Sequence, residues 1–131
     1  MNIMDIKEGK TFYHLRITIT GGIYELNKVN IDFIRENIGG IFQIRYAEPI
    51  SFFSYTCIYK KHYIEESNSP YFIKMGADEY LTLPNKQALM KAVRAQITRY
   101  STYPQLKLRT VVNYRNSIRR IKQLHCPYIA T

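Results

Sequence analysis

The sequence lacks tryptophan, has only two cysteines and contains no long apolar run. Cys57 and Cys126 stand in no CxxC or CxxH spacing, so they predict neither a disulfide framework nor a structural zinc site. No apolar run approaches the roughly 18 residues of a membrane-spanning helix, and residues 1–8 are too polar for a signal peptide. We therefore expect a soluble, intracellular, cytoplasmic protein that does not bind membranes and forms one domain over residues 1–131.

Acidic residues are also missing from the C-terminal part of the chain. Residues 1–79 hold nine Lys or Arg and ten Asp or Glu, whereas residues 80–131 hold ten Lys or Arg and no acid. The net charge of +9 therefore comes entirely from residues 80–131. Such a segment either faces water as a solvated helix surface or binds an external polyanion. Nucleic acid is the predicted partner, because release of counterions from phosphates drives its binding to cationic proteins.

The N-terminal part of the chain has the alternating pattern of β-strands. Over residues 12–20 an apolar set alternates with a polar set, namely Tyr13, Leu15, Ile17 and Ile19 against His14, Arg16, Thr18 and Thr20. Gly21-Gly22 predicts a tight turn, and residues 23–26 begin a return strand. Residues 30–37 read as a short helix with Asn30 as its N-cap, ended by Gly39-Gly40.

Three more strands and two helices follow in the predicted order. The strands cover residues 41–46, 52–59 and 79–83, and the first helix runs from about residue 85 to residue 100. The second helical pattern has an apolar side made of Val111, Val112, Ile118, Ile121 and Leu124. We therefore predict an α+β fold in which helices pack on one face of an antiparallel sheet.

The other face of this sheet is the predicted DNA-binding surface. A two-stranded ribbon can enter the major groove of DNA, where Arg and Gln side chains bond base edges. The alternative is that these polar residues simply face water, as on any half-exposed sheet. We predict DNA contacts from the sheet, from the residues after the strand at 52–59 and from the second helix. They are His14, Arg16, Thr18, Thr20, Gln43, Arg45, Lys60, Lys61, Arg115 and Arg119.

Three stretches of the chain resemble the LAGLIDADG homing endonucleases. MNIMDIKEG at residues 1–9 is similar to a single, divergent copy of the family motif and runs directly into a strand. VNIDFIRENIGGIFQIRY resembles the middle helix, glycine turn and following strand of that family. YLTLPNKQALMKAVRAQITRYSTYPQLKLR resembles its last strand, the next helix and the turn before the final helix. The resemblance implies an αββαββα fold with an insertion around residues 60–76.

The resemblance also implies magnesium-dependent cleavage of DNA. Glu8 matches the final acid of the motif, which in that family holds a divalent metal at the scissile phosphate. Carboxylates are preferred ligands of Mg²⁺, whose bound water serves as a nucleophile. Lys107 and Arg109 match the basic turn of the family and would stabilise charge on the phosphate. Possible carboxylate partners of Glu8 are Glu48, Asp78 and Glu79.

Several functions fit these expectations. The first is a sequence-specific DNA endonuclease or nickase of a phage or mobile genetic element, acting on double-stranded DNA as a monomer or homodimer. The second is a DNA-binding protein without catalysis, such as a repressor or replication blocker on the same fold. The third is an inhibitor that binds a nucleic-acid enzyme and does not bind DNA itself.

Overall fold

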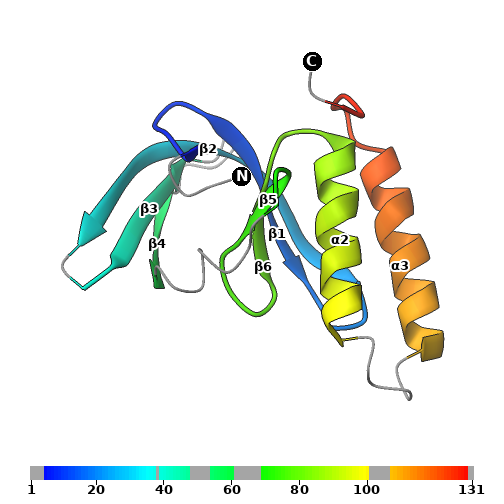
Figure 1. The fold of residues 1–131 in the computed structure, drawn as a ribbon. Coiled ribbons are helices and arrows are strands. Elements are labelled where there is room, and N and C mark those ends of the chain that lie inside the picture. Colours follow the sequence, from blue (N-terminus) through cyan, green and yellow to red (C-terminus); the bar gives the residue numbers. More distant parts are fainter. Residues whose placement is uncertain (1–4, 38, 48–53, 61–68, 101–106, 130–131) are drawn as a thin grey trace.

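The computed structural model describes residues 5–37, 39–47, 54–60, 69–100 and 107–129, and these residues form an α+β fold (Figure 1). The strands are β1 Thr11–Ile17, β2 Ile23–Asn37, β3 Ile41–Ala47, β4 Ser54–Lys60, β5 Phe72–Lys74 and β6 Glu79–Thr82. The helices are α2 Lys86–Tyr100 and α3 Lys107–Lys122. The antiparallel sheet and the two C-terminal helices predicted from the sequence are thus confirmed.

Strands β1 and β2 form the hairpin predicted at Gly21-Gly22, with pairing that runs from Thr11↔Asn30 to Ile17↔Ile23. Position 21 requires glycine for two reasons. Its φ is +86°, and a Cβ there would lie 2.6 Å from Cδ1 of Ile97 on α2. The hairpin turn therefore packs directly against the helix layer. Ile19 was expected in the core, but it follows the end of β1 and is exposed.

The helix predicted over residues 30–37 is wrong. This segment is the second half of β2 and pairs with β3 from Asn30↔Ala47 to Asn37↔Ile41. A helix of this length is marginal without tertiary support, so pairing with a neighbouring strand decides the structure. Gly39 and Gly40 have φ values of +89° and +72° and belong to the turn between β2 and β3. Along the described residues the order is six strands followed by two helices, not αββαββα.

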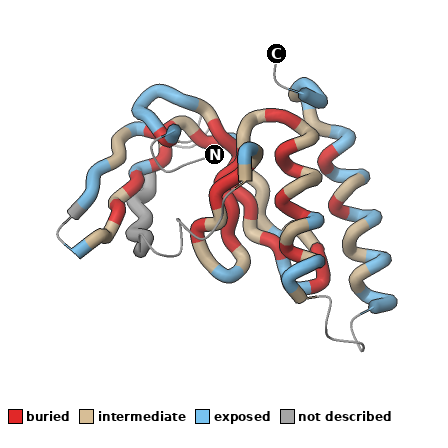
Figure 2. Tube along the Cα trace, viewed as in Figure 1, coloured by how far each residue is buried: buried red, intermediate tan, exposed pale blue. Residues whose placement is uncertain are grey.

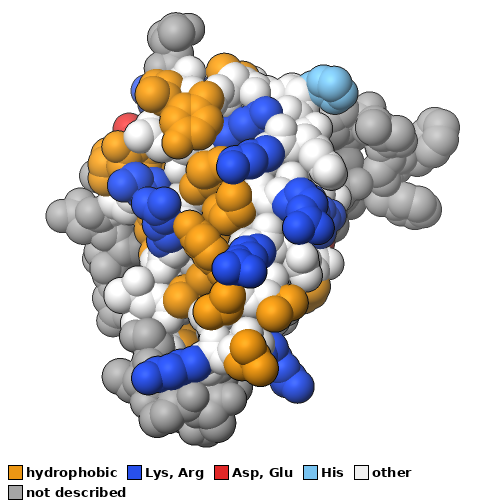
Figure 3. All heavy atoms as spheres, turned by 90° about the vertical axis from the view of Figure 1, so that its right-hand side faces the viewer, with side chains coloured by type: hydrophobic (Ala, Val, Ile, Leu, Met, Phe, Trp, Pro, Cys, Tyr) orange, Lys and Arg blue, Asp and Glu red, His pale blue; other side chains and the backbone are white. Residues whose placement is uncertain are grey.

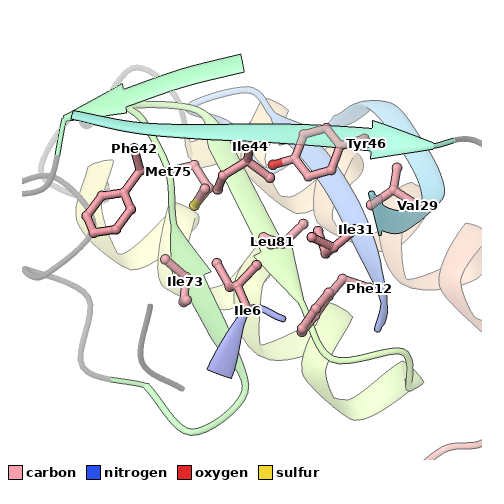
Figure 4. Packing of buried hydrophobic residues seen from close by; sticks show 10 residues of the cluster. All are labelled: Ile6, Phe12, Val29, Ile31, Phe42, Ile44, Tyr46, Ile73, Met75 and Leu81. Carbon is pink, nitrogen blue, oxygen red and sulfur yellow. The ribbon is translucent and has the colours of Figure 1, made fainter. Parts of the chain in front are cut away.

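The strands form one antiparallel sheet in the order β4-β3-β2-β1-β6-β5. On one face, Phe42 and Ile44 of β3 belong to the same cluster as Ile73 of β5 and Leu81 of β6 (Figure 4). Because β2 and β1 separate these strands in the sheet, the contact requires the sheet to curl over this face. We call this cluster the inner core; its members are Ile6, Phe12, Val29, Ile31, Phe42, Ile44, Tyr46, Ile73, Met75 and Leu81.

The opposite face of the sheet carries the helices. Tyr13, Leu15 and Ile17 of β1 point toward this side, as predicted, and pack with residues of α2 and α3. Figure 2 shows buried residues on β1, on β6 and along α2, whereas much of α3 is exposed. We call this cluster the helix core; its buried members are Tyr13, Leu15, Ile17, Phe72, Tyr80, Leu89, Ala92, Val93 and Ile121. The sheet therefore has an apolar core on each of its faces.

Helix α2 is built into the helix core. It begins after Asn85, whose Oδ1 accepts a hydrogen bond from the backbone nitrogen of Ala88 at 2.8 Å and so caps the helix. Gln96 is fully buried, accepts a hydrogen bond from the Tyr80 hydroxyl at 2.5 Å and donates one to the Ile17 carbonyl at 3.0 Å. The apolar and polar contacts of α2 both fix it to the sheet.

Helix α3 docks in a different way. Its fully buried residues are Ser117 and Ile121. The Ser117 hydroxyl donates a hydrogen bond to the Gly21 carbonyl at 2.6 Å and accepts one from the Ile23 backbone nitrogen at 3.1 Å. Asn113 donates to the hydroxyl of Thr20 at 2.5 Å. Polar contacts with the hairpin turn thus hold α3 at the side of the molecule and leave its outer face to solvent.

Candidate nucleic-acid interface

The polar face predicted for the sheet does not exist as one surface. The strand register places His14 opposite Asn27 and Arg16 opposite Glu25, on the face that also carries Tyr46 of β3. This is the face of the inner core. Gln43 and Arg45 alternate with the inward residues of β3, so they point away from it. Alternation within one strand could not reveal that the polar residues of β1 and β3 lie on opposite faces, because this depends on the pairing between strands.

His14 is the clearest correction, since its side chain is buried and does not face solvent. Its ring lies 5.6 Å from the Tyr46 ring, with Nε2 3.4 Å from Oε2 of Glu79 and Nδ1 3.9 Å from Oε1 of Glu25. Arg16 binds the same two carboxylates, Glu25 through Nε and Glu79 through Nη2, both at 3.1 Å. Arg16 therefore forms ion pairs with the two carboxylates that border the buried His14 ring, and its charge is compensated.

The two threonines predicted as DNA contacts stabilise the hairpin turn instead. The Thr18 hydroxyl accepts a hydrogen bond from the Gly22 backbone nitrogen at 3.0 Å and lies 3.1 Å from the Thr20 hydroxyl. Thr20 is buried and receives the bond from Asn113 of α3. Thr18 is exposed, but its hydroxyl is used within the turn. These residues position α3 and do not form a binding surface of their own.

The outer side of β3 is polar, and the charge of its arginine is compensated by a carboxylate. Arg45 lies 3.2 Å from a carboxylate oxygen of Asp32 on β2. Gln43 accepts a hydrogen bond from Nε of Arg35 at 2.7 Å. Lys60 is the last residue of β4, and Lys61 lies outside the described residues. The exposed side of β3 therefore presents an ion pair and an amide, which attract a polyanion far less than free cations do.

The outer face of α3 gathers exposed cations and exposed apolar side chains. Figure 3 shows hydrophobic side chains in a stripe with Lys and Arg on both sides. Leu108 is 80% exposed, and Val111 and Val112 are about half exposed, although the spacing of the two valines predicted a buried side. The exposed cations of this helix, which we call the cationic face of α3, are Lys107, Arg109, Arg115, Arg119, Arg120 and Lys122. Arg115 and Arg119, predicted as DNA contacts, lie together on this face.

Hydrogen bonds hold some cations of the helix layer without cancelling their charge. Arg94 of α2 donates to the Tyr114 hydroxyl at 3.1 Å, and this bond raises the pKa of Arg94. Arg120 donates to the Ile23 carbonyl at 3.3 Å. The described part of the chain shows no ion pair between a carboxylate and a cation of α2 or α3. The positive potential of this side is therefore not offset locally, and it favours an anionic partner.

The structure does not bring together the residues implied in cleavage. Glu8 is exposed in the turn before β1, whereas Lys107 and Arg109 lie in the first turn of α3. Helix α3 docks at the far end of β1, and the seven residues of that strand span roughly 20 Å. Figure 1 shows these segments at different ends of the molecule.

The described carboxylates named as partners of Glu8 have other contacts. Glu79 pairs with Arg16 near the far end of β1, and Asp78 accepts a hydrogen bond from the Tyr24 hydroxyl. Glu48 lies outside the described residues. Among the residues that are described, no group of three or more His, Cys, Asp or Glu side chains is placed to hold a metal ion. Mg²⁺ is commonly held by one or two carboxylates together with phosphates of the substrate, so the metal site at Glu8 stays a prediction.

Comparison with known proteins adds no relative from which a function could be transferred. No protein-family model, no curated protein and no solved structure matches the chain. Within the described ranges, neither helix has the length and apolar character needed to cross a bilayer. Function is therefore inferred from the surfaces of the molecule, of which the cationic face of α3 is the most distinctive.

Proposed function

We propose that the protein binds double-stranded DNA through the cationic face of α3. The observation that carries this proposal is the separation of charge between the two parts of the chain. Every acid lies within residues 1–79, and the exposed cations of α3 have no carboxylate partner among the described residues. Each cation that meets a phosphate releases a condensed counterion, and this release is the main driving force of such binding.

The position of α3 supports the proposal in a second way. The helix is held by Ser117 and Asn113 on one side, while its opposite side projects into solvent with Arg115 and Arg119. The binding surface is thus fixed by buried contacts before a partner arrives. A preorganised cationic surface loses little conformational entropy on binding, which favours affinity. On β1 and β3, the arginines described above are paired with carboxylates, so these strands present their charge less freely than α3 does.

The proposal is tested by fluorescence anisotropy with a labelled 20-base-pair duplex at low salt. Replacing Arg115, Arg119 and Lys122 together by Gln should weaken binding about 100-fold or more, because three phosphate or base contacts are lost. The matched control replaces three exposed cations of the sheet, Lys28, Arg35 and Arg45, by Gln. It removes the same charge and should change the affinity by less than about threefold. Absence of duplex binding by the unaltered protein would refute the proposal and would favour an inhibitor that binds a protein.

Cleavage of the bound DNA is a separate proposal, which rests on the resemblance to the LAGLIDADG homing endonucleases. It assigns Glu8 as the metal-binding carboxylate and Lys107 and Arg109 as the charge-stabilising residues. The test incubates supercoiled plasmid with the protein and Mg²⁺. Conversion to open circles indicates a nickase, and conversion to linear DNA indicates cutting of both strands. Loss of this activity in Glu8→Gln supports the assignment, and activity that survives in Glu8→Gln rejects it.

Binding without cleavage is the alternative within the same proposal. A protein of this kind would act as a repressor or replication blocker, and its cationic helix would be sufficient for that role. The observation that favours it is the separation of Glu8 from Lys107 and Arg109 by the length of β1. The plasmid assay separates the two functions, since a protein that only binds retards the plasmid on a gel and leaves it supercoiled.

A further inference from the structure

The exposed side chains of α3 form one continuous ridge. Leu108, Val112, Arg115 and Arg119 follow one another at intervals of four, three and four residues, which places them in line along one side of a helix. All four are exposed. Their direction is opposite to that of Ser117 and Ile121, the buried residues of the helix. The ridge is therefore the part of α3 that projects farthest from the molecule.

We propose that this ridge lies in the major groove of B-form DNA and that Arg115 and Arg119 read guanine bases there. The inference rests on the proposed binding of duplex DNA through α3. A helix with its side chains is about 10–12 Å wide and fits the major groove, which is about 12 Å wide. Arginine bonds O6 and N7 of guanine with two parallel hydrogen bonds, the most frequent specific contact in protein–DNA complexes. Neither arginine is held by a carboxylate among the described residues, so both are available for this contact.

The apolar part of the ridge supports the same placement. Leu108 is 80% exposed and Val112 is 50% exposed, and neighbouring apolar side chains so placed can contact an apolar group of a partner. The thymine methyl group in the major groove is such a partner. A purely electrostatic surface for phosphates would have no use for Leu108 and Val112. From Leu108 to Arg119 the helix rises roughly 17 Å, so the ridge reaches about five base-pair steps.

The flanks of the ridge carry the cations that would meet the two phosphate backbones. Arg109 and Arg120 lie on the flank next to β2, where Arg120 already contacts the Ile23 carbonyl. Lys122 lies on the other flank and lines a shallow groove with Arg115, Arg119 and Tyr114. Cations on both flanks of an inserted helix match the phosphates on both rims of the groove. A helix lying across one strand would need cations on one flank only.

Binding of duplex RNA tests whether the ridge lies in the major groove. Its major groove is deep and narrow, and side chains of a helix cannot read the bases in it. We therefore expect the protein to prefer duplex DNA over duplex RNA of the same length by tenfold or more. Selection from a library of duplexes with a randomised centre should yield a short site that contains two guanine positions. The variants Arg115→Ala and Arg119→Ala should each lose preference at one of these positions by about tenfold.

Two control variants separate base reading from general charge. Lys122→Ala should weaken binding to all selected sequences equally, since a phosphate contact carries no sequence information. Arg35→Ala, on the outer side of the sheet, should leave both affinity and preference unchanged. Thermal unfolding of each variant checks that the fold is retained, which the exposure of these residues leads us to expect.

The outcomes distinguish failure of this inference from failure of the proposed function. Binding of duplex DNA without sequence preference, or with a preference that Arg115→Ala and Arg119→Ala leave intact, would overturn the major-groove placement alone. Equal affinity for RNA and DNA duplexes would do the same. No binding to any duplex in low salt would overturn the proposed function itself, and binding only to vesicles of anionic lipid would identify a membrane surface as the partner.

Discussion

Helices α2 and α3 are 15 and 16 residues long, run side by side and carry basic residues without a single acid (Figure 1). They differ in what they bury. Helix α2 buries Ala88, Leu89, Ala92, Val93 and Gln96, whereas α3 buries Ser117 and Ile121. Helix α2 thus serves the core, whereas α3 is attached through Ile121 and a few polar contacts and presents its cations outward. The difference shows that composition does not tell which basic helix presents its cations to solvent; burial does.

The largest effect on stability should come from the core side of α2. Leu89 is fully buried in the helix core, so Leu89→Ala should lower the free energy of unfolding by about 3 kcal/mol, through lost burial and the cavity left behind. Leu108→Ala is the matched change in α3, where the side chain is 80% exposed, and it should cost less than about 0.5 kcal/mol. Urea denaturation followed by circular dichroism measures both. Similar costs for the two leucines would contradict the distinction between the helices.

The buried polar contact of α2 should have the next largest effect. Tyr80→Phe removes the hydroxyl that donates to Gln96 and leaves a buried amide oxygen without that donor. A cost of about 2 kcal/mol in the free energy of unfolding is expected. Tyr128→Phe is the control, because Tyr128 is 57% exposed, and its effect should be close to zero. A neutral Tyr80→Phe variant would mean that Gln96 does not depend on this hydrogen bond.

The attachment of α3 can be tested at Ser117. Ser117→Ala removes a hydrogen bond to the Gly21 carbonyl and leaves the Ile23 backbone nitrogen without its acceptor. We expect a loss of about 1 kcal/mol in the free energy of unfolding, less than for either α2 variant. Asn116→Ala, at an exposed neighbouring position, is the control for helix propensity. A larger loss at Ser117 than at Leu89 would show that α3 is as integral to the core as α2.

Alkaline pH gives the most gradual effect. Burial, with a further contribution from Cys126, raises the pKa of Tyr13 to about 12, and burial also raises the pKa of Tyr80. Because these pKa values are higher in the folded chain than the ordinary value of about 10, the stability they contribute is complete below pH of about 10 and is lost toward pH 12. Urea midpoints between pH 8 and 11.5 should therefore fall at the alkaline end. The urea midpoint should fall less steeply with pH in Tyr13→Phe. A fall as steep as in the unaltered protein would contradict the assignment of this effect to ionisation of Tyr13.

Local patterns in the sequence predicted much of this fold. The type of an element could be predicted from its own residues for β3, which alternates, for the strand before Pro84 and for α2, which has a helical apolar period. Residues 30–37 do not alternate regularly, because the pairing shifts between Ile31 and Phe33, and the strand neighbours on either side decide their structure. Element types were thus accessible where the pattern was regular, and they were not where pairing between distant residues decided.

The candidate site shows the same limit. The sequence indicated Arg115 and Arg119 through the charge asymmetry, which needs no knowledge of the fold. It misassigned His14, because alternation within β1 does not reveal that the sheet curls over one face, and Thr20, which lies past the end of β1 against α3. It also read Val112 as a core residue, since an apolar side chain at helical spacing is usually buried. Its exposure is visible only after α3 is docked through Ser117.

The salt dependence of duplex binding tests the central claim most directly. If roughly six phosphates are contacted, a plot of log K against log salt concentration should have a slope near −5 for the unaltered protein. Replacing Arg109, Arg120 and Lys122, the cations on the flanks of the ridge, by Gln should bring the slope to about −2 to −3, since each lost phosphate contact changes it by about 0.9. The triple Gln variant of Lys28, Arg35 and Arg45 should keep the original slope. Equal slopes for the two triple variants would contradict the assignment of α3 as the DNA-binding surface.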